Sequence, residues 1–177
     1  MYNEFIWKRM DLPSGVIIKD NFLENEYAGE IENWFMVWCP WSYSPVVVDV
    51  RDHADDFQFT HTFFDNNRGF VSEGPAGLKK IIEMINPQVW LRIKSNLRFK
   101  TEQVRVSQMH IDFNIPISFT SIYYVNNNDG RTTFENGSYV ESRRNRFLTF
   151  PSYLKHAGST CSNNKERLVI NFNYIPY

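Results

Sequence analysis

The sequence contains little cysteine and no long apolar run, and each absence excludes a class of protein. Only two cysteines occur among the 177 residues, too few for a secreted domain stabilised by several disulfides. No apolar stretch approaches the roughly 20 residues that a membrane span requires. The N-terminal residues also lack the apolar segment of a signal peptide. We therefore expect a soluble, cytoplasmic protein that does not bind membranes.

The chain also lacks an excess of charge and an excess of glycine or proline. Its net charge is −1, from 19 basic and 20 acidic residues, so nucleic acid is not expected as a partner. Glycine and proline number eight each, and no repeat, low-complexity tract or linker is present, which argues against a fibrous or disordered chain. The length is typical of one domain, so we expect a single domain over residues 1–177.

Aromatic residues are abundant, at 16% of the chain, and two early segments have helical spacing. Residues 24–38 repeat apolar side chains every three or four positions, which predicts a helix with one buried face. The members of that face are Tyr27, Ile31, Trp34, Phe35 and Trp38. A second helix is predicted over residues 75–85, because Pro75 suits a first helical turn and Pro87 follows the end.

Most of the remaining chain has the composition of short strands. β-branched and aromatic residues dominate nine runs separated by turn residues, and Asn136-Gly137 is a strong hairpin signal. The runs cover residues 45–50, 57–64, 88–99, 103–113, 118–125, 131–135, 138–142, 146–150 and 167–175. Many short strands with tight turns predict a β-sandwich or barrel, and the two helices would cover one sheet.

The stretch "QMHIDF" places His110 and Asp112 two residues apart in an apolar strand-like run. Residues two apart on a strand point to the same face, and an imidazole beside a carboxylate suits a divalent metal. His156, in "FPSYLKHAGSTC", supplies a candidate third ligand. Two histidines and one carboxylate match the facial triad of non-haem Fe(II) oxygenases. The H-x-D pattern alone is weak, because most such histidines only pack or form hydrogen bonds.

Arg167 lies eleven residues after His156, beyond a turn and inside the apolar run "RLVINFNY". A guanidinium in such a run is costly unless it meets an anion. The distal carboxylate of 2-oxoglutarate could form a bidentate salt bridge with it. The alternative is a surface arginine paired with a glutamate.

From about Trp90 to Tyr174 the sequence resembles a known enzyme family. The segments that carry the resemblance are "RIKSNL", "HIDF", "SIYYVNNNDGRTTFENG", "NRFLTFPSYLKHAGSTC" and "ERLVINFNY". In this order they resemble the Fe(II)/2-oxoglutarate-dependent dioxygenases of the prolyl 4-hydroxylase-like group. The most similar members are the small 2OG-Fe(II) oxygenases of phage and marine microbes, and a phage-encoded protein would fit this resemblance.

The resemblance implies a mainly β fold, a double-stranded β-helix or jelly roll with the N-terminal helices on one face. The barrel core would span about residues 88–177, supported by residues 1–87. His110, Asp112 and His156 would bind Fe(II), and Arg167 the 5-carboxylate of 2-oxoglutarate. The resemblance implies two further roles. Tyr124 would contact the same carboxylate; the alternative is that it is a core aromatic. Asn96 would hold the 1-carboxylate, but Arg98-Phe99 stands where the family has Tyr-Pro, so this contact departs from the family pattern.

The implied activity is oxidative decarboxylation of 2-oxoglutarate coupled to C–H hydroxylation by O₂, with ascorbate as a further candidate cofactor. The substrate is an unidentified small molecule or peptide, with peptidyl proline one candidate. Two other classes stay open: a cupin-type jelly-roll metalloenzyme that does not use 2-oxoglutarate, and a non-catalytic barrel that only binds a partner. We interpret His53 and His61 as packing or hydrogen-bonding residues rather than site residues.

Overall fold

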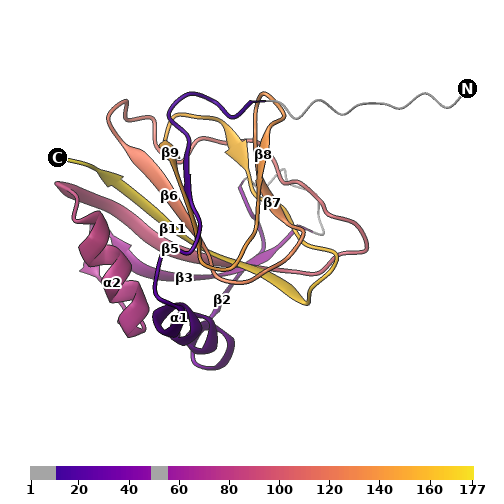
Figure 1. Cartoon of the computed structure of the whole chain (residues 1–177), viewed down its shortest axis with the longest axis horizontal. Coiled ribbons are helices and arrows are strands. Elements are labelled where there is room, and N and C mark those ends of the chain that lie inside the picture. Colours follow the sequence, from indigo (N-terminus) through magenta and orange to yellow (C-terminus); the bar gives the residue numbers. More distant parts are fainter. Residues whose placement is uncertain (1–10, 49–55) are drawn as a thin grey trace, which may run out of the picture.

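Two antiparallel β-sheets lie face to face in the computed structural model, which describes residues 11–48 and 56–177 (Figure 1). The larger sheet has the strand order β1, β9, β6, β11, β5, β3, β2, and β4 pairs with β3. Its strands are β1 (Ile17–Lys19), β9 (Arg146–Pro151), β6 (Phe119–Tyr124), β11 (Glu166–Ile175), β5 (Val89–Phe99), β3 (Gln58–Asp65), β2 (Ser42–Ser44) and β4 (Gly69–Phe70). The smaller sheet contains β10 (His156–Ala157), β7 (Arg131–Phe134) and β8 (Tyr139–Glu141). This is the mainly β jelly roll that the sequence predicted.

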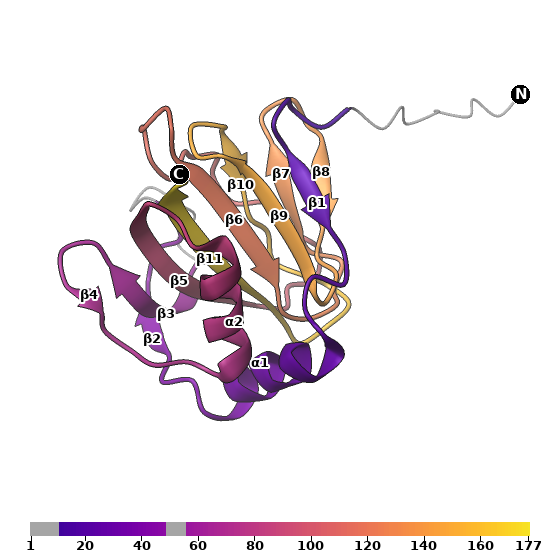
Figure 2. The same ribbon diagram turned by 60° about the vertical axis from the view of Figure 1, so that its left-hand side comes forward.

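Two helices, α1 (Asn25–Val37) and α2 (Ala76–Ile85), cover the outer face of the larger sheet (Figures 1 and 2). Both were predicted from the spacing of apolar residues. In α1 the side chains of Ala28, Ile31 and Phe35 are buried. Trp38 was expected on the same face, but it is the C-cap residue and is 69% exposed, because the helix ends before the next turn is complete.

The core consists of two apolar clusters, one on each side of the larger sheet. The first fills the space between the sheet and the helices and includes Ile31, Phe35, Leu78 and Ile93. The second lies between the two sheets and consists of Ile122, Tyr124, Phe134, Val140, Leu148, Phe150 and Val169. Because successive strand residues point to opposite faces, neighbouring residues of β6 join different clusters, and the sheet is buried on both sides.

Strands β5 and β11 run side by side and bring polar residues to the inner face of the larger sheet. Their register pairs Arg167 with Arg98, Val169 with Asn96, Asn171 with Lys94 and Asn173 with Arg92. The intervening residues of β5, Leu91, Ile93, Ser95 and Leu97, are buried. The alternation therefore separates an apolar face toward the helices from a polar face toward the barrel interior.

Two predicted strands are wrong, and one predicted hairpin is confirmed. Residues 103–113 have no regular strand; isolated bridges pair Val106 with Ser159 and His110 with His156. Residues 45–48 are not in a strand either, and residues 49–50 lie outside the described residues. The hairpin at Asn136-Gly137 joins β7 to β8 as expected. No helix in the described part of the chain is long and apolar enough to cross a membrane.

Candidate metal centre

Three potential metal ligands converge at one end of the space between the sheets. His110, Asp112 and His156 each offer one ligand atom, and these atoms lie within 4.8 Å of one another. The backbone fixes this meeting, since the amide of each histidine donates to the carbonyl of the other at 2.9 Å. The two imidazole Nε2 atoms lie 3.8 and 3.9 Å from the Asp112 carboxylate. Small side-chain rotations would bring all three atoms to the roughly 2.0–2.2 Å of metal–ligand bonds.

Both histidines are oriented by a hydrogen bond on the ring nitrogen that faces away from Asp112. His110 Nδ1 lies 3.3 Å from the carbonyl of Gln108, and His156 Nδ1 lies 2.9 Å from the carbonyl of Leu154. A carbonyl only accepts, so Nδ1 carries the proton and Nε2 keeps its lone pair for a metal. Burial lowers the pKa of His156, with Asp112 acting in the opposite direction, so its imidazole is neutral at pH 7.

Asp112 is held by three donors from three different strands. Arg92 donates to Oδ1 at 3.1 Å, and Oδ2 accepts from Thr120 at 2.9 Å and from Asn173 at 3.0 Å. Burial acts to raise the pKa of Asp112, but His156, Arg92, His110 and the Asn173 amide together lower it to about 2. The carboxylate is therefore charged at neutral pH, which is the form that binds a metal.

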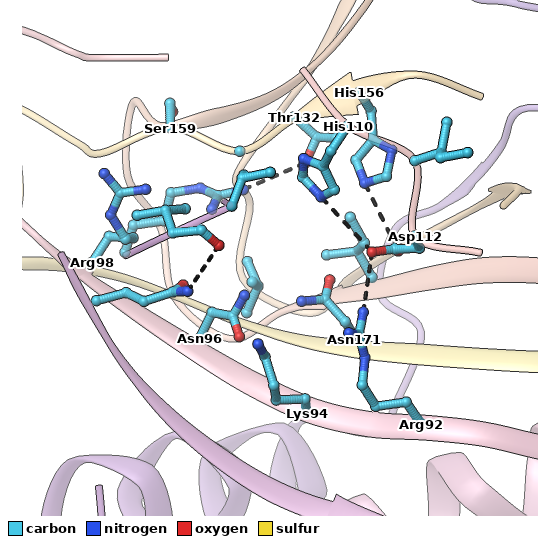
Figure 3. A pocket seen from close by; sticks show the side chains of 18 residues that line it. Arg92, Lys94, Asn96, Arg98, His110, Asp112, Thr132, His156, Ser159 and Asn171 are labelled. Atoms are coloured by element: carbon cyan, nitrogen blue, oxygen red, sulfur yellow. Dashed lines mark hydrogen bonds and ion pairs between the residues drawn. The ribbon is translucent and has the colours of Figure 1, made fainter. Parts of the chain in front are cut away.

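A cavity of about 330 Å³ extends from these three residues between the two sheets. Basic and amide side chains of β5 and β11 line its floor, namely Arg92, Lys94, Asn96, Arg98 and Asn171 (Figure 3), together with Arg167. Two of these cations have carboxylate partners, since Arg92 pairs with Asp112 and Arg98 with Asp56. The remaining excess of positive charge favours an anionic ligand.

Arg167 lies on the cavity floor and is only 4% exposed. Its Nε donates to Ser142 at 2.9 Å and its Nη2 lies 3.4 Å from Thr132 Oγ1. No carboxylate of the described residues forms an ion pair with it. Burial lowers its pKa to about 10, so the guanidinium stays charged at pH 7. A side chain at Gly158 would begin 3.6 Å from Nη1, and glycine there keeps the space beside the guanidinium open.

The comparisons with known proteins found similarity of structure and none of sequence. No family model matches the chain, and no curated protein sequence gives a significant match. A prolyl hydroxylase from Trichoplax adhaerens, solved with a peptide fragment of hypoxia inducible factor, is similar with a TM-score of 0.62 and 14% identity over 91% of this chain and 83% of that one. A prolyl-4-hydroxylase from Pseudomonas putida has a TM-score of 0.61 and 12% identity over 92% and 93% of the two chains.

A third similar structure is that of an epimerase rather than a hydroxylase. SnoN, a non-haem α-ketoglutarate-dependent epimerase of nogalamycin biosynthesis, has a TM-score of 0.65 and 10% identity over 92% of this chain and 76% of its own. The chain has the fold of the 2OG-Fe(II) oxygenases. Because that fold is shared by hydroxylases and an epimerase, the reaction has to be inferred from the residues of the site.

Of the two other predicted site residues, Asn96 lines the cavity and Tyr124 does not. The buried Oδ1 of Asn96 has no hydrogen-bond partner within the described residues. Tyr124 is fully buried in the core between the sheets. Its hydroxyl donates to Thr132 at 2.8 Å, and its ring lies 5.7 Å from the Arg167 guanidinium carbon. Thr132, rather than Tyr124, is exposed to the cavity.

The sequence analysis missed the residues that hold Asp112 and the lysine of the cavity floor. Arg92, Thr120, Asn173 and Lys94 were not among the candidates. One signal was available, because polar residues occupy positions 92, 94, 96 and 98 of one strand-like run and positions 167, 171 and 173 of another, with mostly apolar residues between them. His61 forms hydrogen bonds with the Pro40 carbonyl and Ser72, and His53 lies outside the described residues.

Proposed function

We propose that this protein is an Fe(II)- and 2-oxoglutarate-dependent oxygenase that hydroxylates a C–H bond, formed as a single domain over residues 1–177. The observation that carries the proposal is the buried Arg167 guanidinium, which pairs with no carboxylate of the described residues and lines the same cavity as His110, Asp112 and His156. A buried charge without a partner is costly. A dicarboxylate bound to the metal at one end would supply the missing anion at the other.

The donor set fits a divalent iron. Two imidazole nitrogens and one carboxylate leave several coordination positions open for other ligands. Zinc sites of structural type use four protein ligands, and the described residues offer no fourth histidine, cysteine, aspartate or glutamate in this cluster. The ligand count therefore supports a catalytic centre with open positions.

Iron(II), 2-oxoglutarate and O₂ supply the oxidising chemistry, in which one oxygen atom enters succinate as CO₂ is lost and the other enters the substrate as a hydroxyl group. The residues of the chain bind and orient. Arg92, Thr120 and Asn173 fix the plane of the Asp112 carboxylate, which determines where the open positions face. The small barrel interior keeps the reacting groups away from bulk water.

We assign the 5-carboxylate of 2-oxoglutarate to Arg167, assisted by the Thr132 hydroxyl. Tyr124 would act through Thr132, since its hydroxyl hydrogen is already donated to that residue. Burial raises the pKa of Tyr124, against the nearby Arg167, so the phenol is neutral and a donor at physiological pH. Asn96 also lines the cavity, and we assign the 1-carboxylate of 2-oxoglutarate to its side-chain amide, whose Nδ2 is the group that donates hydrogen bonds.

Titration of 2-oxoglutarate into anaerobic Fe(II)-loaded protein tests the proposal. The wild type should develop the metal-to-ligand charge-transfer absorption of a chelated 2-oxo acid. Arg167→Ala should weaken 2-oxoglutarate binding at least about 30-fold, because it removes a buried charge-assisted pair, while Fe(II) affinity stays close to that of the wild type. Arg167→Lys should recover part of the loss, since lysine supplies the charge without the planar fork.

Arg68→Ala is the matched control, because Arg68 is a solvent-exposed arginine whose ion pair with Asp65 is at the surface. It should change neither affinity. A wild-type protein that binds Fe(II) without the absorption band would contradict the co-substrate assignment, and the cupin-type metalloenzyme would become the leading alternative. A wild type that binds no metal at all would favour a non-catalytic barrel.

A further inference from the structure

Lys94 is a second cation of the cavity floor that has no anionic partner among residues 11–48 and 56–177. Its side chain points into the cavity between those of Arg92 and Asn96 (Figure 3). Its ammonium group forms no ion pair or hydrogen bond with any described residue, whereas Arg92 and Arg98 are each paired with a carboxylate. Asn171 is its cross-strand neighbour on β11 and also lines the cavity.

The position of Lys94 makes this unpaired charge unfavourable in the empty protein. Burial, together with the positive charge of Arg92, lowers the pKa of Lys94 to about 8, while Asp112 acts in the opposite direction. Asp112 does not neutralise Lys94, because its two oxygens already accept from Arg92, Thr120 and Asn173. A neutral side chain of the same length would avoid this cost. The charged ammonium group of Lys94 would therefore be stabilised by binding an external anion.

2-Oxoglutarate alone does not provide enough negative charge for this cavity. Its two carboxylates would be matched by Arg167 and by the divalent metal, which together are already more positive than the dianion. Lys94 would then remain without a counter-charge in the loaded enzyme. The cavity, at about 330 Å³, is near the lower end of the roughly 300–1,000 Å³ of small-molecule sites, which favours a small second ligand.

We propose that Lys94, with the Asn171 amide beside it, binds a carboxylate of the primary substrate, which is therefore a small carboxylic acid. The proposal rests on the oxygenase function proposed above and names the substrate class of that same site. A carboxylate held at Lys94 would fix the substrate beside the metal, since Lys94 and Arg92 are two residues apart on β5 and Arg92 contacts Asp112. Hydroxylation would then occur at a carbon a fixed distance from the acid group.

Acid and amide pairs test this specificity. The protein loaded with Fe(II) and 2-oxoglutarate is given amino acids and short organic acids, each also as its primary amide, beginning with L-proline and L-prolinamide. Binding is followed under anaerobic conditions by the shift of the charge-transfer band, and turnover by succinate release above the rate without substrate. The acids, and not the amides, should shift the band and stimulate succinate release.

Lys94→Met should weaken binding of the stimulating acid at least about 30-fold, as loss of a close charge pair does, and leave 2-oxoglutarate affinity unchanged. Lys94→Arg should retain part of the affinity. Lys80→Met, at an exposed lysine of α2, is the matched control and should behave as the wild type. Amides that act as well as acids, or a Lys94→Met variant that loses 2-oxoglutarate affinity instead, would overturn the proposal.

A binding measurement without metal separates this proposal from the proposed function. Acetate is titrated into the metal-free protein, and the ε-methylene signals of ¹³C-labelled lysine are followed by NMR. The Lys94 signal, assigned by its absence in Lys94→Met, should move with acetate while that of Lys80 does not. This arm also decides the matter where no panel member stimulates turnover: a Lys94 signal that is insensitive to acetate overturns the anion site, whether or not the protein binds 2-oxoglutarate.

Discussion

Replacing Lys94 with methionine should make the metal-free protein more stable, although the residue lines the candidate site. Burial and the nearby Arg92 lower the pKa of Lys94 from 10.5 to about 8. A pKa lowered this far corresponds to about 3 kcal/mol of unfavourable free energy for the charged form in the folded protein. Methionine has a similar length and no charge. Because the folded protein relaxes around a buried charge, we expect the free energy of unfolding to rise by about 1–3 kcal/mol at pH 7.

The same shift predicts how this gain depends on pH. The pKa of Lys94 is lower in the folded than in the unfolded protein, so between about pH 8 and 10.5 the unfolded chain binds more protons and wild-type stability rises with pH. Below pH 8 both states are charged, and the full cost applies. The methionine variant has no such cost at any pH. The stability difference between variant and wild type should therefore be largest near pH 7 and shrink toward pH 10.

Urea unfolding of the metal-free proteins at pH 7 and pH 10 measures this difference. The comparison of variant with wild type at each pH cancels the titration of the other lysines and tyrosines, and Lys80→Met controls for the loss of an ordinary surface lysine. A Lys94→Met variant that gains no stability, or gains the same amount at both pH values, would mean that the ammonium is well solvated. The reasoning that Lys94 is held in the cavity for an anion would then fail.

Two other variants test the metal ligands and the setting of Arg167. Asp112→Ala should abolish binding of Mn(II) in calorimetry and leave the far-ultraviolet circular dichroism unchanged; a large loss of stability in the metal-free variant would instead indicate a structural aspartate. Gly130→Ala should lower 2-oxoglutarate affinity and leave metal binding intact, because its Cβ would lie 2.4 Å from Arg167 Cδ and displace the guanidinium. Gly29→Ala, whose Cβ would meet nothing closer than 3.6 Å, is the control and should bind 2-oxoglutarate normally.

Local patterns in the sequence predicted both helices and most of the longer strands, and they selected three candidate metal ligands. The spacing of apolar residues predicted α1 and α2, since a helix buries one face every three or four residues. His110 and Asp112 were selected by their two-residue spacing, and His156 by its position in "FPSYLKH". The structure brings all three together, although the strand on which the argument relied is absent at residues 103–113. A backbone bridge between the two histidines holds them instead.

The tertiary structure decided which polar side chains share the cavity and what each of them contacts. The sequence analysis missed Arg92 and Lys94, because alternation along β5 places them on one face with Asn96 but does not show whether that face meets solvent or the barrel interior. Tyr124 was interpreted either as a co-substrate contact or as a core aromatic; it lies in the core between the sheets, and its hydroxyl donates to Thr132 of the facing sheet. The sequence alone determines which residues of one strand share a face, because side chains alternate between the two faces of an extended backbone. The charge balance of a site depends on strands that are distant in sequence. Among the described residues, the closure of the two sheets pairs Arg92 with Asp112 and gives Lys94 no carboxylate partner.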